Sequence, residues 1–210
     1  MGSEVGWTCQ LLSLAGMLTS LNPSTTAKRI LHLRIELLYV EPMVWRRVWV
    51  PETVKLKKLD RIIQESMGWT NSHLHAFTID GKRYGSRDQD DWGMDSNLLD
   101  EKRYAIGDVL GDVGIECSYV YDFGDDWVHR IVVERIEGAT SLNNWAMCVA
   151  GENACPPENV GGPPGYERFR ESMADKSHPE FSNYWRWVGG PFDPAGFDMN
   201  LANQRIRKLR

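Results

Sequence analysis

Hydrophobic and polar residues alternate with a period of two at the start of the ordered sequence. Residues 30–37 place an apolar side chain at every second position, and residues 44–50 resume the pattern after the interruption at Glu41-Pro42. A period of two is typical of strands that bury one face. We therefore expect two neighbouring strands, paired antiparallel, at the beginning of the folded region.

The pattern then changes to the period of a helix. Between residues 56 and 67 the apolar side chains gather on one helical face, and Gly68 is placed to end the helix in a left-handed conformation. A third strand is expected over residues 73–79, and Asp80-Gly81 predicts a tight hairpin turn after it. The apolar face of the predicted helix is formed by Leu56, Leu59, Ile62, Ile63 and Met67.

The second half continues with strands and ends with helices. Residues 115–121 and 127–136 predict another strand pair, and residues 138–165 are rich in Gly, Pro and Asn, which predicts a long ordered loop. Helical patterns follow over residues 166–173, 179–188 and 198–209. Strands joined by hairpins, followed by helices, predict an α+β domain over residues 29–210. Residues 1–28 show no clear period and are expected to form a poorly ordered extension.

Composition and charge restrict the function more than they define it. The 210 residues are 42% hydrophobic and 25% charged, as in an ordinary globular domain, and the net charge is −5. This charge argues against general DNA binding. Basic residues cluster over 46–61 and 205–210, and acidic ones over 88–101; we expect solvated faces, with a nucleic-acid contact as the alternative.

The sequence pattern predicts neither a secretory signal nor a membrane span. No basic residue precedes the apolar stretch 11–18, and no run reaches the roughly 18 apolar residues of a membrane span. The four cysteines contain no C-x-x-C pair and no disulfide framework. The sequence therefore favours a cytoplasmic protein without a membrane partner.

Histidines supply the first candidate chemistry. His73 and His75 lie two residues apart on an expected strand, so both should point to one face, and His129 lies on another expected strand beside apolar neighbours. Imidazoles in such positions can bind a metal ion. They can equally be core histidines that are hydrogen-bonded through one ring nitrogen. We expect His129 to lie near the histidine pair.

Carboxylates and thiols supply the second set of candidate residues. Asp122, Asp125 and Asp126 surround a glycine, where they can bind a hard cation or simply favour a tight turn. Cys148 and Cys155 are spaced more widely than in a structural zinc knuckle, so they could complete a metal site with a histidine or be two small buried side chains. Burial and turn formation are the favoured interpretations.

Three stretches of the chain are distinctive in combination. The first joins residues 45–47 (WRR) to 67–77 (MGWTNSHLHAF), and the second is 119–129 (YVYDFGDDWVH). The third runs from Cys148 through Gly151 to 154–166 (ACPPENVGGPPGY). In this order they resemble the plasmid pRiA4b ORF-3-like family, from about residue 30 onwards.

The resemblance implies a fold rather than an activity. It implies a curved, mostly antiparallel sheet packed against helices in a roll-like arrangement, with a long Pro/Gly-rich loop and C-terminal helices. Some relatives carry a transposon-resolvase label or are fused to DNA-binding domains, which implies an association with plasmids and mobile genetic elements. The nucleophilic serine context of a serine resolvase, Tyr-x-Arg-x-Ser, does not occur in this sequence.

We favour a binding module over an enzyme, with an unidentified protein or small molecule as partner and no cofactor. The first alternative is a hydrolase or nuclease that binds zinc or another divalent metal through a His/Asp cluster. The second is an accessory protein in DNA transactions, based on the basic stretch 46–61. The candidate pocket is expected where the histidine pair, the second stretch and the Pro/Gly-rich loop converge. Its residues are His73, His75, Tyr121, Asp122, Asp126, His129, Cys155 and Glu158.

Overall fold

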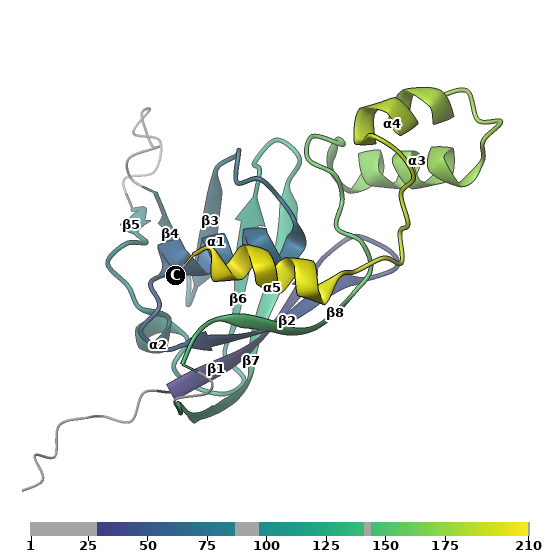
Figure 1. Cartoon of the computed structure of the whole chain (residues 1–210). Coiled ribbons are helices and arrows are strands. Elements are labelled where there is room, and N and C mark those ends of the chain that lie inside the picture. The colour runs from purple at the N-terminus through teal and green to yellow at the C-terminus, as the bar shows by residue number, and fades with distance from the viewer. Residues whose placement is uncertain (1–28, 87–96, 141–143, 210) are drawn as a thin grey trace, which may run out of the picture.

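The computed structural model describes residues 29–86, 97–140 and 144–209, which form one sheet and its covering helices (Figure 1). The predicted extension at 1–28 and part of the acidic run lie outside the described residues. The strands are β1 (Arg29–Leu37), β2 (Val44–Pro51), β3 (His75–Ile79), β4 (Lys82–Gly85), β5 (Leu99–Asp100), β6 (Glu116–Tyr121), β7 (Trp127–Gly138) and β8 (Met147–Glu152). The helices are α1 (Leu56–Met67), α2 (Ile106–Val109), α3 (Gly162–Ala174), α4 (Phe181–Val188) and α5 (Met199–Arg207).

The sheet has the order β5-β4-β3-β6-β7-β1-β2-β8. Every neighbouring pair is antiparallel except β4 and β5, which are parallel. Hairpins connect β1 to β2, β3 to β4 and β6 to β7. The predicted α+β class, built largely from antiparallel hairpins, is therefore confirmed.

The longest strands form the centre of the hydrophobic core. Leu33 of β1 is paired with Val48 of β2 on one side and with Val133 of β7 on the other, and all three side chains are buried. Directly opposed residues point to the same face of a sheet. The period of two in the sequence therefore identifies the face on which α1 packs.

Helix α1 begins and ends where the sequence pattern predicts. Its apolar face is fully buried, and Gly68 follows it with φ of 107°, a left-handed conformation that costs least at glycine. The Gly68 N–H donates to the carbonyl of Gln64 at 2.8 Å, which satisfies one of the last free carbonyls of the helix. This prediction is confirmed.

The Asp80-Gly81 hairpin is also confirmed. Asp80 has φ of 47° and Gly81 has φ of 70°, which is the pair of positive values that a type I′ turn requires. The turn joins β3 to β4 with Phe77 opposite Tyr84. The strand itself starts later than expected, at His75 rather than at His73.

The prediction of a loop over residues 138–165 is partly wrong. It contains the end of β7 and the whole of β8, which pairs with β2 at the edge of the sheet. The register between these strands shifts between Arg47 and Val48. A short edge strand with one partner and an irregular register leaves little periodic signal in a sequence.

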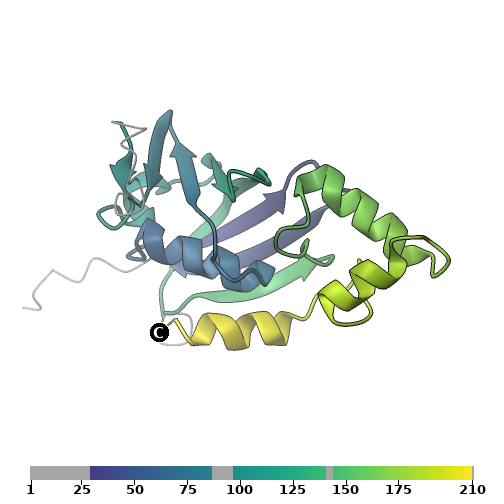
Figure 2. The ribbon, with the colours of Figure 1, turned by 90° about the horizontal axis from the view of Figure 1, so that it is seen from above.

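Helices cover the sheet unevenly. Helix α5 lies beside α1 and near β8, whereas α3 and α4 form a pair that projects beyond the end of the sheet (Figure 2). Among the described residues, no helix has both the length and the apolar composition needed to cross a membrane. The contact between α1 and α5 places Lys57, Lys58 and Arg61 on a helix next to the one that carries Arg205 and Arg207.

Candidate functional site

The two histidines of the 73–75 pair lie against different carboxylates. His73 precedes the strand, and its Nε2 lies 3.4 Å from Asp122 Oδ2 and 3.9 Å from Glu158 Oε2. His75 is buried, with Nε2 2.7 Å from Glu101 Oε2 and Nδ1 3.3 Å from a carboxylate oxygen of Asp60. The pair therefore does not present two imidazoles to one ion.

A buried polar network connects α1 to the sheet. The Tyr119 hydroxyl donates to Asp60 Oδ1 at 2.8 Å and accepts from Gln64 Nε2 at 2.8 Å. Burial raises the pKa of Asp60, although the neighbouring imidazole and hydroxyl oppose the rise. Burial acts on Glu101 in the same sense, but the contacts with His75, reinforced by Lys57, lower its pKa overall. These groups hold the helix in register on the sheet.

His129 lies on the same sheet face as His75 but has no polar contact with it. It is opposite Tyr119 across the β6–β7 pair, and its Nδ1 lies 3.0 Å from the carbonyl of Trp127. Burial lowers its pKa to about 4, so the ring is neutral at physiological pH. The edge of the ring meets the Trp69 indole at a centroid distance of 5.4 Å. The same indole lies 4.9 Å from the Tyr121 ring and 6.1 Å from the Trp127 ring, so it covers this part of the sheet.

The Pro/Gly-rich loop is fastened to the sheet through Glu158. Its Oε1 accepts from the Thr70 N–H at 2.7 Å, from the Thr70 hydroxyl at 2.9 Å and from the Tyr121 hydroxyl at 3.0 Å. The Trp69 indole N–H donates to the Pro156 carbonyl at 2.9 Å. Burial, together with the nearby carboxylate, raises the pKa of Tyr121 to about 12. These hydrogen bonds hold the loop against the sheet and the end of α1.

The aspartates of the β6–β7 turn serve the backbone. Asp122 Oδ1 accepts from the N–H groups of Gly124 and Asp125, and Asp125 Oδ2 accepts from the Gly161 N–H at 3.1 Å. Asp126 is exposed and has a positive φ. The turn therefore uses its carboxylates as turn residues commonly do.

The described cysteines are free and mostly inaccessible. Burial raises the pKa of the Cys148 and Cys155 thiols, although the Arg46 cation opposes the rise in both. Among residues 29–86, 97–140 and 144–209, no group of three His, Cys, Asp or Glu side chains has an arrangement that could hold a metal ion. The thiols are therefore part of the packing around a buried guanidinium.

That guanidinium belongs to Arg46, which the sequence placed in a basic surface stretch. The side chain is 1% exposed. Its Nε donates to the Ser66 carbonyl at 3.0 Å, Nη1 to the Trp45 and Glu152 carbonyls at 2.7 and 2.8 Å, and Nη2 to the Asn153 carbonyl at 2.9 Å. Arg46 therefore joins β2, β8 and the end of α1.

The basic stretch is thus divided by the sheet. Arg47 points to the opposite face from Arg46, where it pairs with Glu134 of β7. Alternation along β2 contained the relevant signal, because Arg46 falls in phase with the buried Val44 and Val48. A nucleic-acid surface that includes both arginines is excluded by this geometry.

A cleft of about 250 Å³ opens beside the buried guanidinium. The ring of Phe197 covers one side of Arg46, with its centroid 3.8 Å from Cζ, and Arg205 lines the same cleft. No described carboxylate forms an ion pair with either arginine. We call this the Arg46 cleft; its principal lining residues are Arg46, Gly68, Trp69, Cys155, Pro156, Glu158, Phe197, Asp198, Leu201 and Arg205.

Comparison with known proteins identifies the family. The family model for the plasmid pRiA4b ORF-3-like protein matches residues 29–201. This chain belongs to the pRiA4b ORF-3-like family. The chain is also 36% identical over 182 residues to an uncharacterized protein, y4hQ, of Sinorhizobium fredii (strain NBRC 101917 / NGR234). That match covers 86% of this chain and 92% of the relative.

A solved structure extends the comparison to the fold. The pRiA4b ORF-3-like chain is similar to the crystal structure of the protein of unknown function MM3350 from Methanosarcina mazei Go1, with a TM-score of 0.73 and 32% sequence identity. The likeness covers 83% of this chain and 98% of that one. The relatives therefore establish the family and the fold but name no activity.

The three stretches that carry the family resemblance meet at one place. The first contributes Arg46 and Trp69, the second contributes Tyr121, and the third contributes Pro156 and Glu158. All but Tyr121 line the Arg46 cleft, and Tyr121 is bonded to a lining residue. Of the candidate residues from the sequence, Cys155 and Glu158 lie at this cleft; Arg46 was missed.

Proposed function

We propose that this pRiA4b ORF-3-like protein is a non-catalytic binding module that holds a compact organic carboxylate in the Arg46 cleft. The observation that carries the proposal is a buried guanidinium without an acidic partner among the described residues. Four of its five N–H groups have carbonyl acceptors, and the second N–H of Nη2 has none.

The electrostatics of the cleft favour an anion. A buried charge is costly unless it is paired, and among the described residues carbonyl dipoles and the Phe197 ring compensate it without a carboxylate. Accordingly, burial lowers the pKa of Arg46. Arg205 lines the same cleft. Its guanidinium packs against Gly68, with Nη1 2.9 Å from the position that a Cβ atom would occupy there. An anion between the two guanidiniums would supply the missing countercharge and accept charge-assisted hydrogen bonds.

Size and rim charge restrict the anion further. A volume of about 250 Å³ is below the range of roughly 300–1,000 Å³ that holds drug-sized ligands, so the ligand must be compact. The walls include the rings of Trp69 and Phe197, which suit a small apolar or aromatic body. Glu158 and Asp198 also line the cleft, and their carboxylates disfavour a multiply charged anion such as phosphate. A monocarboxylate fits these conditions best.

Calorimetric titration with benzoate tests the proposal. Arg205→Gln keeps α5 intact but removes the cation beside the cleft, so benzoate affinity should fall about 10-fold or more, as for loss of one charged hydrogen bond. Arg207→Gln, two residues further along α5 and exposed, is the matched control and should bind as the unaltered protein does. Equal benzoate affinity in the two variants, or no binding at millimolar benzoate, would refute the proposal.

The alternatives receive less support from the geometry. A metal-dependent hydrolase or nuclease would use a cluster in which His75 and His129 are buried and contact separate groups. The full cluster is His73, His75, Asp122, Asp126 and His129. An accessory role in DNA transactions relied on a basic stretch that the sheet divides at Arg46 and Arg47. The association with mobile genetic elements rests on the family resemblance and is kept as a proposal.

A further inference from the structure

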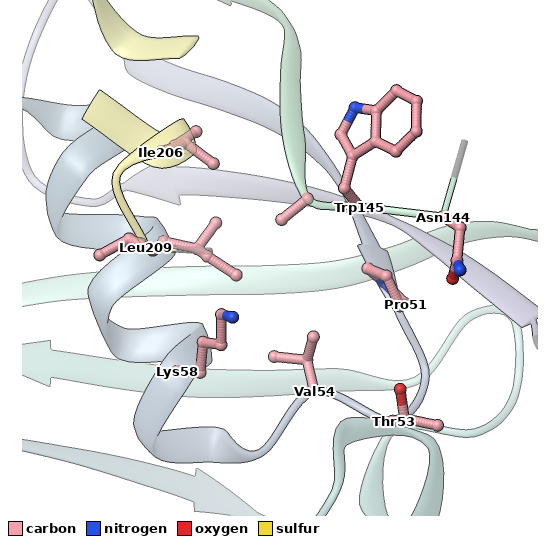
Figure 3. Close-up of a pocket in the computed structure, with 10 residues that line it drawn as sticks. Pro51, Thr53, Val54, Lys58, Asn144, Trp145, Ile206 and Leu209 are labelled. Atoms are coloured by element: carbon pink, nitrogen blue, oxygen red, sulfur yellow. The ribbon is translucent and has the colours of Figure 1, made fainter. Parts of the chain in front are cut away.

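A second cleft, of about 450 Å³, lies beside the last turn of α5, at Ile206 and Leu209 (Figure 3). It is formed where α1, the segment after β2, the segment before β8 and the end of the chain meet. Its volume is within the usual range of small-molecule sites, roughly 300–1,000 Å³. We call it the Lys58 cleft; Thr53 and Asn144 add polar side chains beside Lys58, and an apolar wall comes from Pro51, Val54, Ile62, Trp145, Ile206 and Leu209.

Lys58 places a positive charge beside this apolar wall. Figure 3 shows its side chain extending from α1 toward Leu209 and Val54. Lys58 also lines an adjoining cleft of about 340 Å³, whose other residues are mostly basic and include Lys57 and Arg61. Lys58 therefore lies between the apolar wall of one cleft and the basic side chains of the other.

The basic neighbours differ in how far they are already paired. Lys57 lies 3.2 Å from Glu101, and Arg61 lies 3.5 Å from Glu65. Lys58 has no acidic partner among the described residues, and its side chain is exposed. An incoming anion can therefore bind the Lys58 ammonium without displacing an existing ion pair.

From this juxtaposition we infer that the Lys58 cleft binds a small single-chain amphiphile with an anionic head. The apolar body lies along Val54, Ile206 and Leu209, and the head contacts Lys58. A neutral ligand would leave the ammonium unpaired, and a cationic head would be repelled. Single-stranded nucleic acid is less suited, because it needs successive aromatic faces for its bases, and this cleft offers Trp145 among aliphatic walls.

The inference is independent of the function proposed for the Arg46 cleft. The Lys58 cleft uses Ile206 of α5 and Leu209 after it, whereas the face of α5 at the Arg46 cleft presents Leu201, Ala202 and Arg205. Neither cleft shares a lining residue with the other. Variants can therefore test each site separately.

A chain-length series tests the apolar part. Hexanoate, octanoate and decanoate, each below its micellar concentration, are titrated into the full chain and followed by calorimetry. Burying each added methylene contributes about 0.8 kcal/mol to the binding free energy, so affinity should rise about 4-fold per methylene while the chain still fits. Amide shifts in NMR spectra should locate the change at Leu209 and Val54. An affinity that is independent of chain length would overturn the inference.

Variants and head-group controls test the charged part. Lys58→Met should weaken octanoate binding about 5-fold or more while the gain per methylene remains, as for loss of a charged contact. Lys82→Met, an exposed lysine on β4, is the control and should change nothing. Octanol and octylammonium should bind less tightly than octanoate. Equal binding of all three heads, or unaltered octanoate binding in Lys58→Met, would contradict the inference.

Cross-tests separate this inference from the proposed function. Lys58→Met should leave benzoate binding unchanged, and Arg205→Gln should leave octanoate binding unchanged. If a short oligothymidylate bound at Lys58 and octanoate did not, the surface would be a nucleic-acid site and the inference would be wrong. If octanoate affinity fell only in Arg205→Gln, the amphiphile would occupy the Arg46 cleft, which also overturns it.

Discussion

Replacing Arg46 by methionine is expected to be among the most destabilising substitutions in the chain. Methionine has a similar length but no donor, so four carbonyls of β2, β8 and the end of α1 lose their shared partner. The Phe197 ring also loses the cation that it covers. Three separate elements would be weakened by this one change.

The magnitude follows from the number of bonds and from what replaces them. A buried acceptor left without a donor costs about 1–3 kcal/mol, which gives at least about 4 kcal/mol for four acceptors. Water entering from the adjacent cleft relieves part of this cost, and removal of a buried cation offsets another part. We therefore expect the free energy of unfolding to fall by about 3–5 kcal/mol. For a chain of this length that corresponds to a melting temperature lower by roughly 6–20 °C.

Chemical denaturation measured by tryptophan fluorescence tests this expectation. Arg46→Lys retains the charge but supplies fewer donors and no planar fork, so it should lose less stability than Arg46→Met. It also provides a measurable variant if the methionine protein does not fold. Arg47→Met, which removes a partly exposed pair with Glu134, should cost less than about 1 kcal/mol. If Arg46→Met and Arg47→Met had equal stabilities, the reasoning would be refuted.

Three further predictions concern buried groups. His75→Ala should lower the free energy of unfolding by about 3–5 kcal/mol, measured with urea, because it leaves two buried carboxylates without their imidazole. Native His129 gains a proton only near pH 4, whereas the unfolded chain does so near 6.5, so stability should be full above pH 6.5 and fall toward pH 4. His129→Gln should flatten this decline in denaturation curves; an unchanged decline would assign it to other groups. The described cysteines should resist iodoacetamide until unfolding, because burial raises their pKa values, and mass spectrometry would detect early alkylation.

Local chemistry explains why much of the fold was predictable. The helix that ends at Gly68 has one apolar face and a residue suited to the left-handed cap, and the Asp80-Gly81 turn needs two positive φ values. Period-two alternation located β1 and β2 because one face of each is buried deeply. These features depend on near neighbours in sequence, so a single sequence contains them.

The site depended on contacts between distant segments and was harder to predict. His73 and His75 looked like a pair, but β3 begins at the second of them, so their rings lie against carboxylates from different parts of the chain. Arg46 looked like part of a charged surface beside Arg47. Only the phase of β2 hinted at its burial, and its acceptors lie up to 107 residues away.

The central claim is that a compact carboxylate binds the buried guanidinium of the Arg46 cleft. A crystal structure of the protein grown with benzoate tests it most directly. The account predicts a carboxylate within roughly 3.2 Å of Arg46 Nη2, with its second oxygen facing Arg205 and its ring between Trp69 and Phe197. Benzoate bound elsewhere, with the Arg46 cleft holding only water at saturating benzoate, would contradict the account.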